Sequence, residues 1–212
     1  LGQHIVFTNA HIGNYEANEK VLQSNKSHAT VIIARNFSYN TFLEKVQSPL
    51  FSGLDTRELV KYLTNTKSSH KSVLTFSEQG PSIDEFNSST LKCNNLEFVS
   101  LESPKVLIEG NNPIVIVDYG IKSAIVDNIL SFGMPTLLLP SNTTAKEIGS
   151  YNPRLIFLSN GPGDPRDHTF QIEQVKKMLE LNIPMRGICL GHQLLGLALG
   201  AKIEKLPFGQ RG

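Results

Sequence analysis

The sequence predicts an α/β protein: a parallel β-sheet flanked by helices, preceded by a β-rich α/β segment. Three observations support this fold class. Strand-like and helix-like stretches alternate four times in the second half of the chain. These strands are apolar at every position, which is typical of strands buried on both faces. Two glycine-bearing loops follow strands, at the edge where the active sites of such sheets lie.

The strands and helices of the second half are delimited by turn residues. Four strands are predicted, at 113–118, 135–140, 154–160 and 183–188. Four helices are predicted, at 121–133, 141–152, 167–182 and 190–199. Ser141 or Asn142 is the expected N-cap of the second helix, which ends before Pro153. Gly133 is the expected stop of the first helix.

Apolar spacing supports the two longer helices. The first helix places isoleucines at helical spacing, at Ile121, Ile125 and Ile129. The third helix has one apolar face, formed by Ile172, Val175 and Leu179. This spacing predicts helices that each cover the sheet with one side.

The first half has weaker patterning. Strands are expected at 5–9 and 30–35, and a short helix at 55–63. Residues 64–103 are polar and are interpreted as loops and a linker. The predicted domains are therefore 1–103 and 104–212, with the boundary near Ser103–Pro104.

Composition excludes several classes of protein. The chain has 212 residues, of which 40% are hydrophobic, and a net charge of +1. This charge gives no reason to expect nucleic acid or an anionic membrane as a partner. No apolar run reaches the roughly 18–20 residues of a membrane span. With only two cysteines, Cys93 and Cys189, a reducing cytoplasm is the expected location.

The turn "GICLG" at 187–191 is the strongest candidate for chemistry. It follows a strand and precedes a helix, so Cys189 is expected in strained, exposed backbone. Gly187 and Gly191 leave room for neighbouring chain. Free N–H groups and the positive end of the helix dipole favour the thiolate. A buried, inert cysteine is the alternative interpretation.

The loop "LSNGPGDP" at 158–165 is the second candidate. Its glycines and prolines predict a rigid turn whose N–H groups point outward. One of these N–H groups, together with that of Leu190, would hold the oxyanion of a tetrahedral intermediate. A tight connection between strand and helix, with no chemical role, is the alternative.

Together these motifs resemble the class I glutamine amidotransferases, which have a flavodoxin-like parallel sheet. "LSNGPGDP", "GICLGHQLL" and "FGQRG" carry the resemblance in the second half. "HIGNY" at 11–15 and "GLDTRELVKYL" at 53–63 resemble the amino-terminal domain of the small subunit of carbamoyl-phosphate synthase. The likeness covers nearly the whole chain and points to this small-subunit family.

The resemblance implies roles for five residues. Cys189 matches the nucleophile that attacks glutamine and forms a thioester. Gly161 and Leu190 match the oxyanion-binding amides, and Gly163 and Gln193 match residues that contact glutamine. The retained cysteine implies use of glutamine, since family members that use free ammonia have lost it.

The resemblance also implies partners. The ammonia is passed to a synthetase, either a separate large subunit or a fused ATP-grasp region, which makes carbamoyl phosphate for pyrimidine or arginine synthesis. ATP and magnesium are used there, so no cofactor or metal is expected in this chain. The sequence does not distinguish fused from separate synthetase, or one pathway from the other.

Parts of the family pattern have no match here. The family's His-Pro-Glu segment, which supplies base and orienting carboxylate, has no counterpart before "FGQRG", and neither has a glutamine-contacting serine near the start. We therefore expect a fragment of a longer polypeptide, truncated at both ends. His192 matches a family position that is not the base, and His168 is the better-placed candidate, with a solvated loop histidine as the default.

Other interpretations remain open. The chain could be a non-catalytic docking module, or a thiol hydrolase of the PfpI type, although the latter lacks the leading domain. Asp55-Thr56-Arg57 is interpreted as a helix N-cap. Asp118 could bind a ligand at a strand end, but no Gly-x-Gly-x-x-Gly motif accompanies it.

Overall fold

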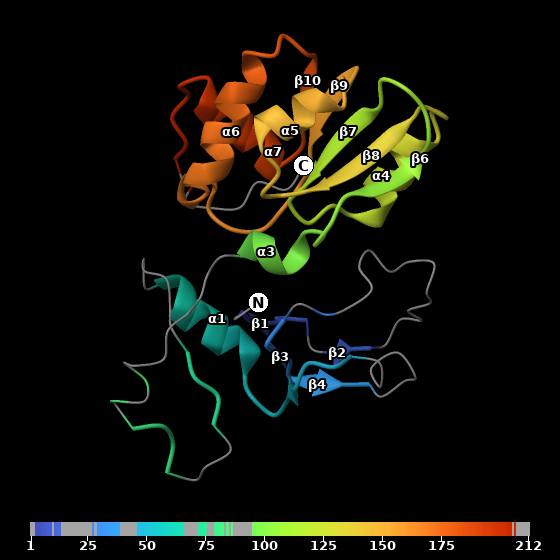
Figure 1. Ribbon diagram of the computed structural model, residues 1–212. Coiled ribbons are helices and arrows are strands. Elements are labelled where there is room, and N and C mark those ends of the chain that lie inside the picture. Colours follow the sequence, from blue (N-terminus) through green and yellow to red (C-terminus); the bar gives the residue numbers. More distant parts are fainter. Residues whose placement is uncertain are drawn as a thin grey trace. The chain divides into compact units, whose positions relative to one another are not determined.

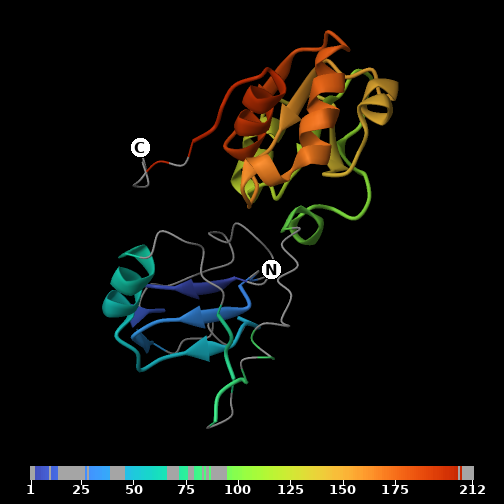
Figure 2. The same cartoon turned by 90° about the vertical axis from the view of Figure 1, so that its left-hand side faces the viewer.

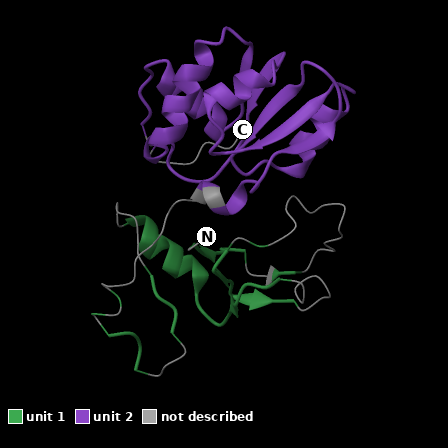
Figure 3. Cartoon of the chain, viewed as in Figure 1, with its two compact units in different colours: residues 1–93 green, residues 94–212 purple. Residues whose placement is uncertain are grey.

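The computed structural model describes residues 3–9, 11–13, 27, 29–38, 46–65, 72–75, 79–82, 84, 86, 95–204 and 206. The chain divides into two compact units, 1–93 and 94–212, which Figure 3 colours separately. The division into domains at Ser103–Pro104 stays a prediction. "HIGNY" lies partly, and Cys93 and the final "FGQRG" lie wholly, outside the described residues.

The first unit is built on short parallel strands. Its strands are β1 (His4–Val6), β2 (His11–Ile12), β3 (Val31–Ile33), β4 (Asn36–Phe37) and β5 (Leu50–Phe51). β1, β3 and β5 form one sheet with β3 in the middle, and β2 pairs with β4. The β-rich character is confirmed. The strand predicted at 5–9 is shorter and begins earlier, because its pairing with β3 covers only residues 4–6.

Helix α1 (Thr56–Asn65) follows β5 and begins as the N-cap interpretation requires. The Asp55 carboxylate accepts hydrogen bonds from the backbone amides of Glu58 and Arg57, both at 3.1 Å. These bonds hold the pKa of Asp55 below its usual value. The motif that carries part of the family resemblance is thus a helix cap in structure.

The second unit contains a five-stranded sheet (Figure 1). Its strands are β6 (Lys105–Ile108), β7 (Ile114–Asp118), β8 (Thr136–Pro140), β9 (Leu155–Leu158) and β10 (Met185–Gly187). The order is β10-β9-β7-β8-β6, and β7 to β10 are parallel. These four are the predicted strands. The chain moves outward from β7 in both directions, so the carboxyl ends of β7 and β9 form the switch point where ligands bind in such sheets.

Strand β6 was not predicted from the sequence. It runs antiparallel to β8 at the edge of the sheet, with a register shift between Val106 and Ile108. Lys105 and Val106 are exposed. Because β6 is only partly buried, it lacks the long apolar run that marked the central strands β7 and β8.

Helices connect the strands. They are α3 (Asn95–Val99), α4 (Ser123–Leu130), α5 (Ala145–Ser150), α6 (Thr169–Leu179) and α7 (Leu190–Ala198), with a 3₁₀ helix, η3 (Pro165–Asp167), before α6. Helix α3 lies in the stretch 64–103 that was expected to be loop. Gly133, at φ +64°, donates its N–H to Leu130 and ends α4 as predicted.

The predicted cap of α5 was wrong. Its N-cap is Thr144, whose hydroxyl accepts from the Glu147 amide while Glu147 accepts from the Thr144 amide. Ser141 instead lies buried at the end of β8, and Thr143 closes a turn back to Pro140. This capping box pairs the backbone amides of Thr144 and Glu147, which would otherwise lack partners at the start of the helix. Ser141 and Asn142 are not the residues that cap α5.

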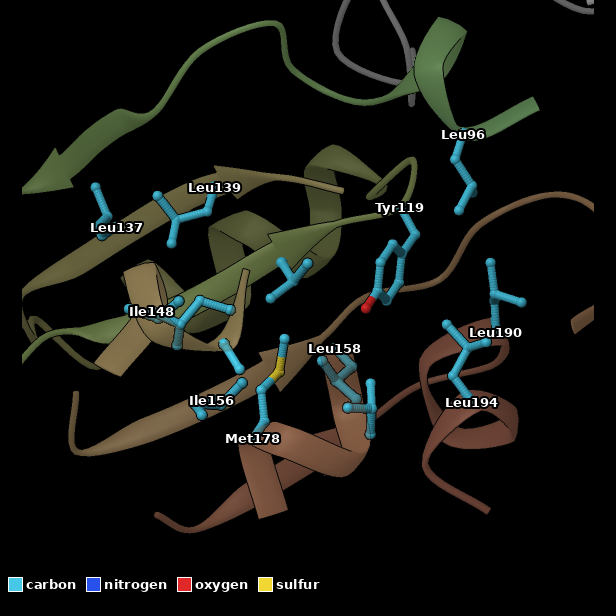
Figure 4. Close-up of a cluster of buried hydrophobic side chains, with 14 residues drawn as sticks. Leu96, Tyr119, Leu137, Leu139, Ile148, Ile156, Leu158, Met178, Leu190 and Leu194 are labelled. Carbon is cyan, nitrogen blue, oxygen red and sulfur yellow. The ribbon is translucent and has the colours of Figure 1, made fainter. Parts of the chain in front are cut away.

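The core lies on both faces of this sheet. On one face, side chains of β7, β8 and β9 pack against α5, α6 and α7, and ten members of this cluster, from strands and helices alike, are labelled in Figure 4. On the other face Ile114, Ile116 and Leu138 pack with Ile129 of α4. Figure 1 and Figure 2 both show α6 and α7 side by side. This two-sided burial confirms the fold class read from the apolar strands.

Candidate active site

The turn between β10 and α7 presents Cys189 in strained backbone. Cys189 has φ 51° and ψ −113°, a left-handed region that non-glycine residues rarely occupy. Such a residue costs on the order of 1–3 kcal/mol and persists only where its surroundings hold it. Its side chain is exposed. The prediction of a strained, exposed turn is confirmed, and Cys189 is not buried.

Two glycines allow close backbone approach at this turn: Gly191 lies against β9, and Gly187 lies against the start of α7. A Cβ at Gly191 would overlap the carbonyl oxygen of Leu158, and a Cβ at Gly187 would lie 2.6 Å from the backbone nitrogen of His192. The Ile188 amide donates to Leu158 at 3.0 Å and the Gly191 amide to Ser159 at 2.9 Å. The turn is therefore bonded to the end of the neighbouring strand.

The loop after β9 is held by the side chains of Ser159 and Asn160, which were not predicted as site residues. The buried Ser159 hydroxyl accepts from the Tyr119 amide at 2.8 Å and donates to the Asn160 carbonyl at 2.8 Å. The Asn160 side chain donates to the Gly120 carbonyl at 2.9 Å and accepts from the Lys122 amide at 3.2 Å. In the sequence, only the position of Ser159 and Asn160 directly before "GPG" could have indicated that they support the loop.

Gly161 and Leu190 meet where the two loops converge. A Cβ at Gly161 would lie 2.8 Å from Leu190 Cδ2 and closer still to the carbonyl oxygen of Tyr119. Within the described part of the chain, neither the Gly161 amide nor the Leu190 amide donates a hydrogen bond. The Leu190 amide belongs to the first turn of α7, beside the positive end of the helix dipole. Two uncommitted amides on adjoining loops can hold a developing negative charge on oxygen.

The remaining two predicted residues lie on the same loops. Gly163, at φ +97°, follows Gly161, and a Cβ there would lie 2.7 Å from Nε2 of His168. Gln193 is exposed on the first turn of α7, and its backbone N–H donates to the Cys189 carbonyl at 3.0 Å. The structure thus packs Gly161 against Leu190, the residue that follows Cys189, whereas no hydrogen bond joins Gly163 to Gln193 in the described part of the chain.

Neither histidine considered as a base bonds to the thiol. His168 is 6% exposed, so the expectation of a solvated loop histidine was wrong; it is enclosed where η3 meets α6. Its Nε2 lies 3.2 Å from the Pro162 carbonyl, which can only accept, so Nε2–H donates. His192 is exposed on α7. Among the described residues, no hydrogen bond joins Cys189 to any histidine.

Asp118 has a structural role at the end of β7. It is buried, and its oxygens accept from the amides of Leu101, Gly120 and Ile121. These bonds stabilise the turn that carries Tyr119.

The rim of the second loop carries an ion pair. Arg166 Nη2 lies 2.6 Å from the Asp164 carboxylate, and both side chains are substantially exposed. Hydrogen bonds from the Arg166 side chain and backbone lower the pKa of Asp164 to about 2. The pair stabilises η3, whose N-cap is Asp164.

No helix in the described portion of the chain has the length and apolar character needed to cross a membrane. In the same portion, no group of three or more histidine, cysteine, aspartate or glutamate side chains could hold a metal ion.

Comparison with known proteins assigns both parts of the chain. The family model "Glutamine amidotransferase class-I" matches residues 115–212, and "Carbamoyl-phosphate synthase small chain, CPSase domain" matches residues 1–73. Proteins named carbamoyl phosphate synthase small chain from Caldanaerobacter subterraneus subsp. tengcongensis, Methanosarcina acetivorans and Streptococcus mutans are each 34% identical over 100% of this chain.

The chain spans 60%, 63% and 61% of the length of these three relatives, in that order. The two family models match the two parts in the order that the sequence motifs predicted. The chain belongs to the carbamoyl-phosphate synthase small-chain family, with a CPSase domain followed by a class I glutamine amidotransferase region.

Proposed function

We propose that this chain carries the glutamine-hydrolysing site of a carbamoyl-phosphate synthase. The observation that carries the proposal is the exposed Cys189, held at positive φ on a strand-to-helix turn, followed by Leu190, whose side chain packs on Gly161; the amides of both these residues are uncommitted in the described part of the chain. A nucleophile and an oxyanion site are the two groups that amide hydrolysis through an acyl-enzyme requires.

The proposed reaction begins when the Cys189 thiolate attacks the carboxamide carbon of glutamine. The carbonyl electron pair moves onto oxygen, and the amides of Gly161 and Leu190 stabilise that oxyanion. Collapse of the intermediate breaks the C–N bond, and ammonia leaves after gaining a proton. Water then cleaves the thioester to glutamate and restores the thiol. Gly163 and Gln193 are proposed to contact the glutamine.

Proton transfer in this scheme needs a base that the described histidines do not supply to Cys189. His168 is bonded to Pro162, and His192 makes no bond to the thiol in the part of the chain that the structure describes. We therefore expect the 212 residues alone to hydrolyse glutamine slowly. Turnover like that of a complete amidotransferase would contradict this expectation.

The partners are proposed from the family. Ammonia would pass to a synthetase, either a large subunit or a fused ATP-grasp region, which would consume ATP with magnesium and make carbamoyl phosphate for pyrimidine or arginine synthesis. This chain would need no cofactor, and the reaction would take place in the cytoplasm. Residues 1–103 would form the CPSase domain and residues 104–212 the amidotransferase domain.

A chloroketone analogue of glutamine tests the proposal. The Cys189 thiolate would displace chloride from the carbon beside the ketone, forming a C–S bond and releasing chloride. We expect Cys189 to react at least about tenfold faster than Cys93, which corresponds to roughly 1.4 kcal/mol of recognition, and glutamine to slow the reaction. Peptide mass spectrometry measures both rates.

A non-catalytic docking module is the second candidate, favoured by the absence of a histidine bonded to Cys189 among the described residues. Equal labelling of both cysteines, with no protection by glutamine, would support it. A PfpI-type hydrolase is disfavoured because residues 1–73 match the CPSase domain.

A further inference from the structure

His168 is buried beside the loop 158–165, whose Gly161 amide is proposed to bind the oxyanion. No catalytic step of the proposed reaction uses this histidine. It is the N-cap residue of α6, and its imidazole is 6% exposed. Burying a polar ring is unfavourable unless it is hydrogen-bonded, so a buried histidine calls for a partner. That partner is the Pro162 carbonyl, 3.2 Å from Nε2.

The imidazole also occupies the space beneath Gly163. A Cβ at Gly163 would lie 2.7 Å from Nε2 and 3.2 Å from Cε1 of His168. The positive φ of Gly163 and its missing side chain allow the loop to lie directly on the ring. The His168 side chain thus hydrogen-bonds to Pro162 and packs under Gly163.

The two ends of the loop are supported differently. Ser159 and Asn160 tie the first half to the turn after β7, through Tyr119, Gly120 and Lys122. In the described structure, His168 makes the only side-chain hydrogen bond to the backbone of residues 161–163. The Gly161 amide lies between these two anchors.

We propose that His168 is a positioning residue that aims the Gly161 amide at the oxyanion through its bond to Pro162. The inference rests on the proposed function for its catalytic consequence. It assigns His168 no contact with glutamine and no proton transfer. Losing the bond would let the loop shift, and displacement of about 1 Å can cost as much as 100-fold in positioned chemistry.

Two replacements separate the hydrogen bond from the bulk of the ring. His168→Gln keeps an N–H donor with a similar reach, whereas His168→Met fills the space but cannot donate. Lys176→Met, on the exposed side of α6, is the matched control. All variants carry Cys93→Ser, so that intact mass reports modification of Cys189 alone.

The readout is a ratio of two rates of Cys189 modification. The thiolate first adds to the ketone carbon of the glutamine chloroketone, which places negative charge on the ketone oxygen, and the sulfur then moves to the neighbouring carbon as chloride leaves and the ketone reforms. Iodoacetamide alkylates the thiol by direct displacement of iodide, without using an oxyanion site. We expect His168→Met to lower the ratio of chloroketone to iodoacetamide rates at least about tenfold, within the range for a misplaced group. His168→Gln and Lys176→Met should retain the parent ratio. A merely destabilised fold would change both rates together.

An unchanged ratio in His168→Met would overturn the inference and leave the proposed function standing. If the parent protein shows no preference for the chloroketone, the proposed function fails instead. The loop is then judged by the ¹H–¹⁵N resonances of Gly161 and Gly163: shifts in His168→Met that His168→Gln restores support the anchor, and unshifted resonances overturn it. Should His168→Met not fold, His168→Asn, whose amide ends short of the Nε2 position, takes its place.

Discussion

Replacing Gly161 with alanine tests the convergence of the two loops most directly. The added Cβ would meet three atoms: Leu190 Cδ2 and Tyr119 Cβ, each at 2.8 Å, and the Tyr119 carbonyl oxygen, which is closer. Tyr119 and Leu190 are each 1% exposed, so neither has free space to move into. Both belong to the packed cluster of Figure 4.

The size of the effect follows from these contacts. Ordinary contact begins near 3.4 Å, so each 2.8 Å approach must widen by about 0.6 Å, and the carbonyl contact by more. Overpacking of this kind typically costs about 1–3 kcal/mol of stability. Because the Gly161 amide moves with the loop, we expect chloroketone labelling of Cys189 to slow by about 10- to 100-fold.

Urea unfolding and the rate of chloroketone labelling measure the two effects. Gly196→Ala is the matched control, since its Cβ would lie 3.7 Å from Ala201 Cβ, an ordinary contact. Removing a glycine from the interior of α7 should stabilise the protein by about 0.5–1 kcal/mol. If Gly161→Ala unfolds and labels as the parent does, the close approach of the two loops is refuted.

Three further predictions concern strain, burial and charge. Cys189→Gly should raise the free energy of unfolding by about 1 kcal/mol or more, because glycine tolerates positive φ; a loss of stability in urea would show that the turn is not strained. Tyr119→Phe should be neutral or stabilising by up to about 1–2 kcal/mol, because its hydroxyl has no hydrogen-bond partner among the described residues and burial raises its pKa; marked destabilisation would reveal a partner. Asp164→Asn should cost less than about 1 kcal/mol, since the exposed ion pair is screened. Because the folded pKa of Asp164 is depressed to about 2, this contribution is present above the usual carboxyl pKa of about 4 and is lost as pH falls toward 2; a difference from the parent that is constant between pH 6 and 2 would contradict the assignment.

Local pattern was sufficient for most of the second unit. Strands β7 and β8 are buried on both faces, and largely apolar runs predicted the four strands β7 to β10. The bend at Cys189 was predicted because a short apolar strand runs into a helix with glycines on either side. Strand β6 and the Thr144 cap were not found, because one is half exposed and the other depends on which of several neighbouring polar residues reaches Glu147.

The class of sheet, the place of the proposed nucleophile and the family could be predicted from the amino-acid sequence, because each depends on short runs of adjacent residues. The way in which the two loops support each other became visible only in the folded chain. Tyr119 bonds to Ser159 and Gly120 to Asn160 across 40 residues of chain, and His168 folds back beneath Gly163. Such contacts arise when parallel strands bring their carboxyl ends to one edge, and no local period encodes which side chains then meet.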